Sequence, residues 1–358
     1  MKKEFFFHLQ SLRGFAASIV VLHHMKSLSP YLSQNIFMSN SELAVDFFFV
    51  LSGFVISLNY GSVLNDFNIF FDFIKKRFLR LYPLHFFMLF VYLAVEISKY
   101  LFEQKTGLTS NEISFTVNNI STLISNILLL QGIMDSQLSY NEVSWSISFE
   151  FYTYILFSFL VIFIRNKFLY TLIVILLVII SSYFVYKLDL MQSTNQLGFL
   201  RCVYSFFLGT LIFSINKKIE KKDLTVFQIP VTIITIYLFC NITNTIFMPI
   251  VFGFLIIVLN QSRKGIIKSI LKNKLLLFIG KISYSIYMVH YLVIWLHIQI
   301  LRFIFKIDTI TINNYTYLEL TKSSSFLIII SVLISVFLLS ILSFNLIEKK
   351  FNSKSLVN

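Results

Sequence analysis

Long apolar runs separated by short polar stretches repeat along the whole chain. Each run is 15 to 24 residues long, close to the roughly 20 residues that a helix needs to cross the hydrocarbon core of a bilayer. A membrane-spanning barrel would instead show short alternating strands. We therefore predict an all-α polytopic membrane protein with about ten transmembrane helices. The predicted spans are residues 11–29, 43–60, 81–102, 145–164, 168–186, 198–215, 226–240, 245–260, 277–298 and 324–347.

A weaker apolar run, residues 120–134, is interrupted by four polar side chains and is short for a crossing. If it does not cross, 22 of the 30 lysines and arginines share one side of the membrane, seven lie on the other and Arg201 is embedded. Cytoplasmic loops are enriched in these residues. The charge pattern therefore favours ten spans, both termini in the cytoplasm, and a re-entrant or interfacial helix at 120–134.

The composition agrees with this class of protein. Hydrophobic residues make up 57% of the chain, charged residues 13%, and the mean hydropathy is +0.79. The net charge is +13. Most of the lysines and arginines border the spans, so membrane topology explains this charge and we expect no nucleic-acid partner. Cys202 and Cys240 lie in apolar segments, where we interpret them as packing residues. Without repeats or a long linker, residues 1–358 are expected to form one domain with no appended extracytoplasmic domain.

Ionisable side chains inside the spans are costly to bury, by about 3 kcal/mol each on insertion scales, and so are candidate site residues. In the first span Arg13 and His24 are eleven residues apart. That spacing places them on the same helix face to within roughly 20°, separated by about 16 Å along the axis. His23 points elsewhere, so we prefer His24 as the functional histidine.

Four ionisable groups from four predicted helices fall in the outer half of the membrane: His24, Asp46, Glu150 and His290. A histidine held by a carboxylate is a general base that can take a proton from an attacking hydroxyl. Either Asp46 or Glu150 is a candidate partner of His24. The alternative interpretation is structural, with interhelical hydrogen bonds and a Glu150–Arg201 pair.

A cationic patch is predicted at the inner side. Lys76, Arg77 and Arg80 precede the third span, and Arg13 lies at the same depth. Guanidinium groups suit phosphate oxygens. The alternative is an anchor that contacts lipid headgroups.

Two common kinds of catalytic centre lack their sequence signatures. There is no G-x-S-x-G elbow for a serine nucleophile, and no HExxH-like spacing that would indicate a metal. We therefore expect no metal, and direct transfer without a covalent intermediate.

Five blocks of the chain resemble, in order and spacing, those of the bacterial membrane acyltransferase-3 family. They are SLRGFAASIVVLHHM (11–25), VDFFFVLSGFVIS (45–57), FIKKRFLRLYP (73–83), VSWSISFEFYTY (143–154) and GKISYSIYMVH (280–290). The resemblance spans nearly the whole chain. Within these blocks, Arg13 and His24 match the family's R-x10-H motif, and Arg77 and Arg80 match its R-x-x-R motif.

The resemblance implies an O-acyltransferase of the bacterial cytoplasmic (inner) membrane. Such an enzyme takes an acyl group, by default acetyl, from cytoplasmic acetyl-CoA (acyl-CoA). It passes the group to a hydroxyl of a cell-surface glycan or glycolipid such as O-antigen, capsule or exopolysaccharide. The basic cluster would hold the donor, and His24 with Asp46 or Glu150 would carry the catalysis. Further acceptor or oxyanion contacts would come from Trp145, Arg201, Ser283, Tyr287 and His290.

A transporter or flippase for a lipid-linked saccharide is the alternative function. Embedded charges and a re-entrant segment also suit transport. The chain shows no pair of interrupted helices in matching halves, and its strongest charge cluster lies at a predicted cytoplasmic mouth.

Overall fold

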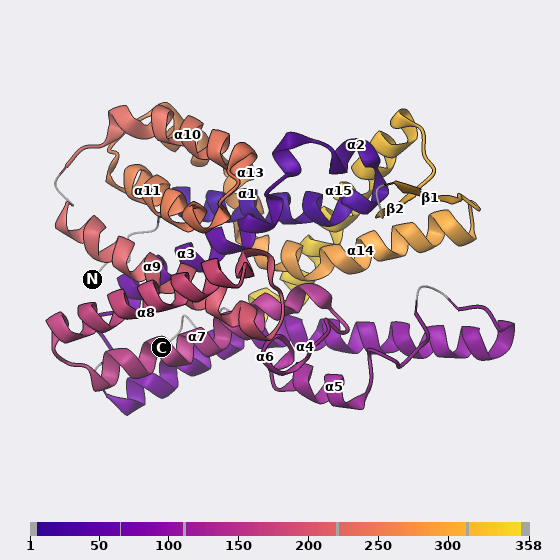
Figure 1. The fold of residues 1–358 in the computed structure, drawn as a ribbon, viewed down its shortest axis with the longest axis horizontal. Helices are drawn as coiled ribbons and strands as arrows, with labels where there is room; N and C mark the ends of the chain where they lie inside the picture. Colours follow the sequence, from indigo (N-terminus) through magenta and orange to yellow (C-terminus); the bar gives the residue numbers. More distant parts are fainter. Residues whose placement is uncertain (1–5, 65, 110–111, 220–221, 313–314, 352–358) are drawn as a thin grey trace.

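The computed structural model of this protein is a bundle of helices elongated along one axis (Figure 1). The residues that it describes are 6–64, 66–109, 112–219, 222–312 and 315–351. Four of the lysines counted on the inner side, Lys2, Lys3, Lys221 and Lys354, lie outside these residues.

Within the described residues, ten helices of 14 to 40 residues build the bundle. They are α1 (Phe7–His24), α3 (Ala44–Tyr60), α4 (Phe67–Thr106), α7 (Trp145–Phe163), α8 (Lys167–Lys187), α9 (Phe199–Lys218), α10 (Gln228–Asn241), α11 (Met248–Gln261), α14 (Ser283–Phe303) and α15 (Lys322–Ser343). The shorter helices are α2 (Pro30–Ser33), α5 (Ile120–Ile127), α6 (Gln131–Met134), α12 (Ile266–Leu271) and α13 (Lys274–Lys281). A π-helical turn, η9 (Phe344–Glu348), extends α15. Eight single 3₁₀ turns lie between the helices: Met25–Leu28, Ile36–Met38, Ser41–Leu43, Glu142–Ser144, Leu190–Gln192, Gln196–Gly198, Thr225–Phe227 and Thr245–Phe247.

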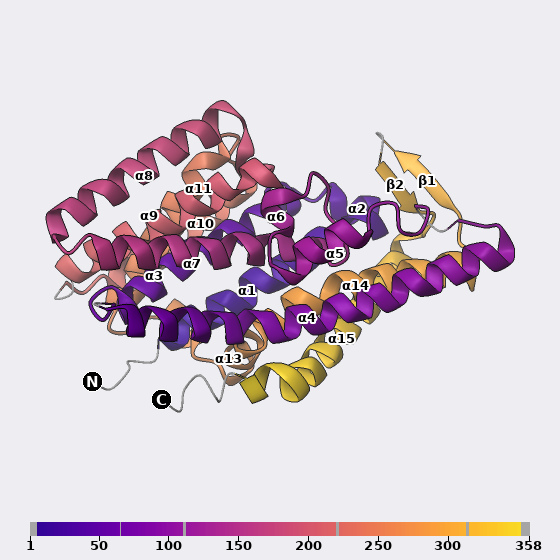
Figure 2. The same ribbon diagram turned by 90° about the horizontal axis from the view of Figure 1, so that it is seen from below.

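The prediction of an all-α polytopic membrane protein is confirmed. Within the described residues, seven helices are long and apolar enough to cross a membrane, and α10 and α11 are shorter apolar helices. Together with α1, these helices coincide with the ten predicted spans. One small feature was not predicted. Strands β1 (Thr309–Ile312) and β2 (Tyr315–Leu318) form an antiparallel hairpin after α14, visible at one end of the long axis in Figure 2.

The weak apolar run at 120–134 does not cross the bundle. It forms α5 and α6, of eight and four residues, and eight residues of helix are only about 12 Å long. The Tyr140 amide donates to Asn118 Oδ1 at 2.6 Å, so the residues that follow the run lie beside those that precede it. Between these points α5 packs against α4, where His85 Nε2 lies 2.9 Å from the Asn126 carbonyl. This agrees with the predicted re-entrant or interfacial helix.

Helices α3 and α9 approach so closely that glycine is needed on both. A Cβ atom on Gly53 would lie 1.9 Å from the Phe206 carbonyl oxygen, and one on Gly209 would lie 2.1 Å from the Val50 carbonyl oxygen. Small residues let transmembrane helices pack backbone to backbone. The contact matters for the site because α3 carries Asp46 and Ser52, and α9 carries Arg201.

We expect Gly53→Leu to separate α3 from α9 and to lower the stability of the purified protein, by about 1–3 kcal/mol or more. The measurement is the midpoint of thermal unfolding in detergent. Ala94→Leu is the matched control, because Ala94 is exposed on α4 and a larger side chain there meets no neighbouring helix. Equal midpoints for the two variants would contradict the close-packing interpretation.

Candidate functional site

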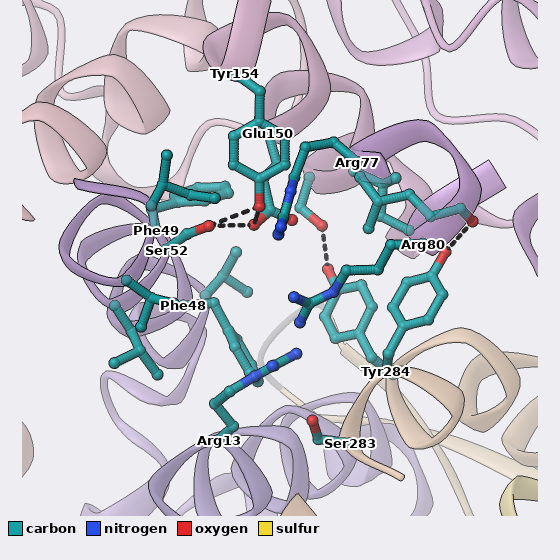
Figure 3. Close-up of a pocket in the computed structure, with 18 residues that line it drawn as sticks. Arg13, Phe48, Phe49, Ser52, Arg77, Arg80, Glu150, Tyr154, Ser283 and Tyr284 are labelled. Atoms are coloured by element: carbon teal, nitrogen blue, oxygen red, sulfur yellow. Dashed lines mark hydrogen bonds between the residues drawn. The ribbon is translucent and has the colours of Figure 1, made fainter. Parts of the chain in front are cut away.

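A pocket lies inside the bundle where α1, α3, α4, α7 and α14 meet (Figure 3). Phenylalanine, valine, leucine and isoleucine side chains form much of its wall. The polar lining consists of Arg13, Ser52, Arg77, Arg80, Ser146, Glu150, Tyr154, Ser283, Tyr284 and Tyr287. These residues lie up to 274 positions apart in the sequence, so only the folded bundle assembles them.

Three arginines supply the charge of the pocket. Arg13, Arg77 and Arg80 all line it, and Glu150 is the one acidic residue among the described residues that do. In Figure 3 the guanidinium groups of Arg13 and Arg80 point toward the middle of the pocket. Arg77 lies 5.3 Å above the ring of Tyr60, and its Nη2 donates to the Tyr60 hydroxyl at 3.3 Å. The pocket therefore carries an excess of two positive charges.

Glu150 belongs to a compact hydrogen-bonded group at one side of the pocket. The Ser52 hydroxyl donates to Glu150 Oε1 at 2.6 Å, and the Tyr154 hydroxyl donates to the same oxygen. Ser52 Oγ and the Tyr154 hydroxyl are themselves 2.7 Å apart. Glu150 and Tyr154 are one helical turn apart on α7, which puts them on the same face. The carboxylate is thereby held beside the arginines.

Two tyrosines of α14 form a fixed wall of the pocket. The Tyr284 hydroxyl donates to the Leu81 carbonyl at 2.5 Å. The Tyr287 hydroxyl donates to the Val143 carbonyl at 2.9 Å and lies 2.7 Å from Ser146 Oγ. Close by, Ser283 Oγ is buried without a hydrogen-bond partner among the described residues. It is free to contact a bound molecule.

A histidine pair lies directly beyond Tyr287. His290 Nε2 is 3.2 Å from His24 Nδ1, across the contact between α14 and α1. His290 is fully buried, and its ring lies 5.8 Å from the ring of Tyr287, which lines the pocket. The basic pocket and the histidine pair are therefore adjacent sites connected by α14.

Asp46 and Arg201 form a third group, separate from both sites. Arg201 donates to both carboxylate oxygens of Asp46, with its Nη2 at 2.6 Å and its Nε at 3.0 Å. Ser205 Oγ donates to Asp46 at 3.1 Å, and the guanidinium lies 5.5 Å above the Trp145 ring. Both charged side chains are at most 1% exposed. Such a closed ion pair joins α3 to α9 beneath Trp145.

Comparison with known proteins identifies the family. A family model described as an acyltransferase domain matches residues 8–345. The chain belongs to the acyltransferase-3 family. A curated protein named "Protein 2 in picA locus", from Rhizobium radiobacter, is 41% identical over 86 residues. That match covers 23% of the acyltransferase and 41% of the curated protein. No solved structure matches the acyltransferase.

The structure of the acyltransferase separates residues that we expected to share one layer. Depth along the helices suggested that His24, Asp46, Glu150 and His290 converge. Instead, only His24 and His290 are in contact; Asp46 is paired with Arg201, and Glu150 lies in the basic pocket. Asp46 and Glu150 were the two candidate carboxylate partners of His24, and neither of them contacts it. The alternative ion pair between Glu150 and Arg201 does not form either, because Arg201 is paired with Asp46.

The structure brings together three of the four residues of the predicted cationic patch of the acyltransferase. Arg13, Arg77 and Arg80 reach one pocket, together with Ser283 and Tyr287. Lys76 is not among the described residues that line it. Arg77 and Arg80 line the pocket beside residues of α7 and α14 and remain partly exposed.

Sequence reasoning missed Tyr154 as a site residue of the acyltransferase. The available signal was its position four residues after Glu150 in an apolar span, where a tyrosine hydroxyl needs a polar partner. Ser52 lies in the block 45–57 that resembles the family, but no role was predicted for it. No group of three histidine, cysteine or acidic residues that could hold a metal ion occurs within the part of the chain that the structure describes.

Proposed function

We propose that the acyltransferase moves an acyl group, acetyl by default, from acyl-CoA to a hydroxyl of a cell-surface glycan or glycolipid such as O-antigen, capsule or exopolysaccharide. One observation carries the proposal. Arg13, Arg77 and Arg80 converge on one pocket inside the bundle, where Glu150 is the one acidic residue of the described lining. The alternative function, a transporter, is set aside because the family is one of acyltransferases.

The charge of the pocket favours a donor that carries phosphate. Placing unpaired positive charge among apolar helices costs several kcal/mol per ion unless a counter-charge arrives. Buried Arg77 Nε also has no hydrogen-bond partner among the described residues. Guanidinium forks pair with phosphate oxygens in two parallel hydrogen bonds. Acyl-CoA provides phosphates for the arginines and a long arm that can carry the thioester along α14 toward the histidine pair.

His24 is the proposed general base. It lies eleven residues after Arg13 on α1, about 16 Å farther along the helix axis. Its imidazole takes the proton of the acceptor hydroxyl as that oxygen bonds to the thioester carbonyl carbon. The carbon–sulfur bond then breaks, and the departing thiolate takes the proton back from the imidazolium. The products are the acylated glycan and free CoA, with no covalent enzyme intermediate.

The direction of transfer follows from the basic loops. The Thr225 hydroxyl donates to Asp223 Oδ1 at 2.6 Å, and the Arg263 amide contacts the same oxygen at 3.3 Å. The lysine-rich loops after α9 and α11 are therefore neighbours at one end of the bundle. The positive-inside rule supports a cytoplasmic location for that end of the bundle. The donor then enters from the cytoplasm of a bacterial inner membrane, and the glycan approaches His24 from outside.

The test of the donor site is acetyl-CoA binding to the purified protein in lipid nanodiscs, measured by titration calorimetry. Arg80→Ala removes one charge-assisted contact, worth about 1.5–3 kcal/mol. We expect its dissociation constant for acetyl-CoA to rise by about 10- to 100-fold.

Lys75→Ala is the matched control for Arg80→Ala. It removes one positive charge from an exposed position of the same helix, outside the described pocket lining, and should bind acetyl-CoA as the parent does. If Arg80→Ala also binds like the parent, the pocket does not hold the donor. If both variants lose the same affinity for acetyl-CoA, Arg80 acts only through the positive electrostatic potential around the cytoplasmic end of the bundle.

A further inference from the structure

The protons of the histidine pair are fixed by the backbone. His290 Nδ1 lies 2.7 Å from the Tyr287 carbonyl and 3.2 Å from the Ile286 carbonyl. A carbonyl oxygen only accepts hydrogen bonds, so Nδ1 must carry the proton. In the neutral ring Nε2 is then an acceptor. Its neighbour at 3.2 Å is His24 Nδ1.

The same reasoning fixes the tautomer of His24. His24 Nδ1 is 3.0 Å from the Val20 carbonyl and faces the acceptor nitrogen of His290. Both neighbours accept, so Nδ1 of His24 carries the proton and donates. Nε2 of His24 is consequently left with its lone pair. That is the atom a general base needs.

We propose that His290 is the positioning residue of the catalytic base, in the place where a histidine base usually has a carboxylate. His290 Nε2 accepts a hydrogen bond from Nδ1–H of His24, holds the ring in the reactive tautomer, and stabilises the imidazolium that forms when His24 Nε2 takes the proton of the acceptor hydroxyl. His290 itself stays neutral, because its Nδ1 proton is held by backbone carbonyls. This role rests on the proposed function, in which His24 is the base.

The nearby carboxylates are committed elsewhere. Asp46 is paired with Arg201, and Glu150 accepts hydrogen bonds from Ser52 and Tyr154. Glu42 Oε2 lies 3.8 Å from Nδ1 of His23, the residue before His24 on α1. Glu142 is hydrogen-bonded to Tyr291, whose ring lies 5.4 Å from the His24 ring. A neutral partner also suits this depth of the membrane, because a buried carboxylate beside His24 would add the cost of another desolvated charge.

Two amide substitutions separate positioning from packing. His290→Asn places an amide nitrogen near the position of Nδ1, so it can still donate to the Tyr287 carbonyl, but it is too short to reach His24. His290→Gln places its amide oxygen near the position of Nε2, so it can still accept from His24. We expect His290→Asn to lower kcat for acyl transfer by at least tenfold with an unchanged KM for acetyl-CoA. His290→Gln should restore most of that loss.

The reverse order, with His290→Asn active and His290→Gln impaired, would overturn the proposal, since only packing against the backbone would then matter. Equal activity of both variants and the parent would overturn it too.

A His24→Gln variant tested alongside distinguishes failure of the His290 role from failure of the proposed base. If His24→Gln is inactive while His290→Asn is fully active, only the role of His290 fails. If His24→Gln is fully active, the proposed base itself is wrong. The double variant His24→Gln with His290→Asn should be no slower than His24→Gln alone, because both act on one proton.

Discussion

Replacing His24 with alanine is expected to reduce acyl transfer by about 10²- to 10⁴-fold, the usual contribution of a general base. The acceptor hydroxyl then has no group to take its proton, while the basic pocket is unchanged. Acetyl-CoA should therefore still bind the variant. The measurement is base-labile acetate released from the surface polysaccharide of cells that carry each variant, at matched levels of protein in the membrane.

His297→Ala is the matched control for this substitution. His297 lies two helical turns beyond His290 on α14, where its Nδ1 is 2.8 Å from the Val293 carbonyl and its Nε2 3.3 Å from Ser331. His297→Ala removes an imidazole from α14, the helix that carries His290, without touching the histidine pair. Full acetylation by His24→Ala would exclude His24 as the base. Loss of acetyl-CoA binding in that variant would show that the substitution disturbs the pocket instead.

Asp46→Ala is expected to destabilise the fold by about 3–5 kcal/mol, because it leaves the guanidinium of Arg201 buried without its counter-charge. The parent pair is closed by three nitrogen–oxygen contacts of 3.0 Å or less. The readout is the fraction of detergent-solubilised protein that remains monodisperse after heating.

The double variant Asp46→Leu with Arg201→Met provides the control. Replacing both members of a buried pair with apolar residues of similar size is often neutral, so it should recover much of the stability. If Asp46→Ala is as stable as the parent, the pair is not the clamp between α3 and α9 that its geometry indicates. If Asp46→Ala is stable but inactive, Asp46 acts in the chemistry after all.

The sequence was sufficient to predict the class of fold and several of the residues that line the candidate pocket. Apolar length marks a transmembrane helix directly, since the bilayer requires it. The spacing of Arg13 and His24 on a single helix also survives folding, because both positions are fixed by one helical axis. Thus the predicted order of a basic site followed by a histidine along α1 matches the structure.

Partners on different helices were beyond that reasoning. Depth in the membrane follows from residue counting, but the rotation of each helix about its axis depends on packing, such as the contact at Gly53 and Gly209. Asp46 and Glu150 were therefore placed at plausible depths and given the wrong neighbours. The interhelical contact between His24 and His290 has no signal in either segment taken alone.

The net positive pocket also bears on how well the membrane stays sealed. A polar cavity among transmembrane helices is a potential leak for ions. Here Arg13, Arg77 and Arg80 create a positive potential that repels hydronium and alkali cations, in the way that arginine does in water-selective pores. The Tyr287 side chain, which lines this cavity, is held next to the histidine pair. A net positive cavity can therefore admit an anionic donor into the bundle while opposing the entry of cations from the same side.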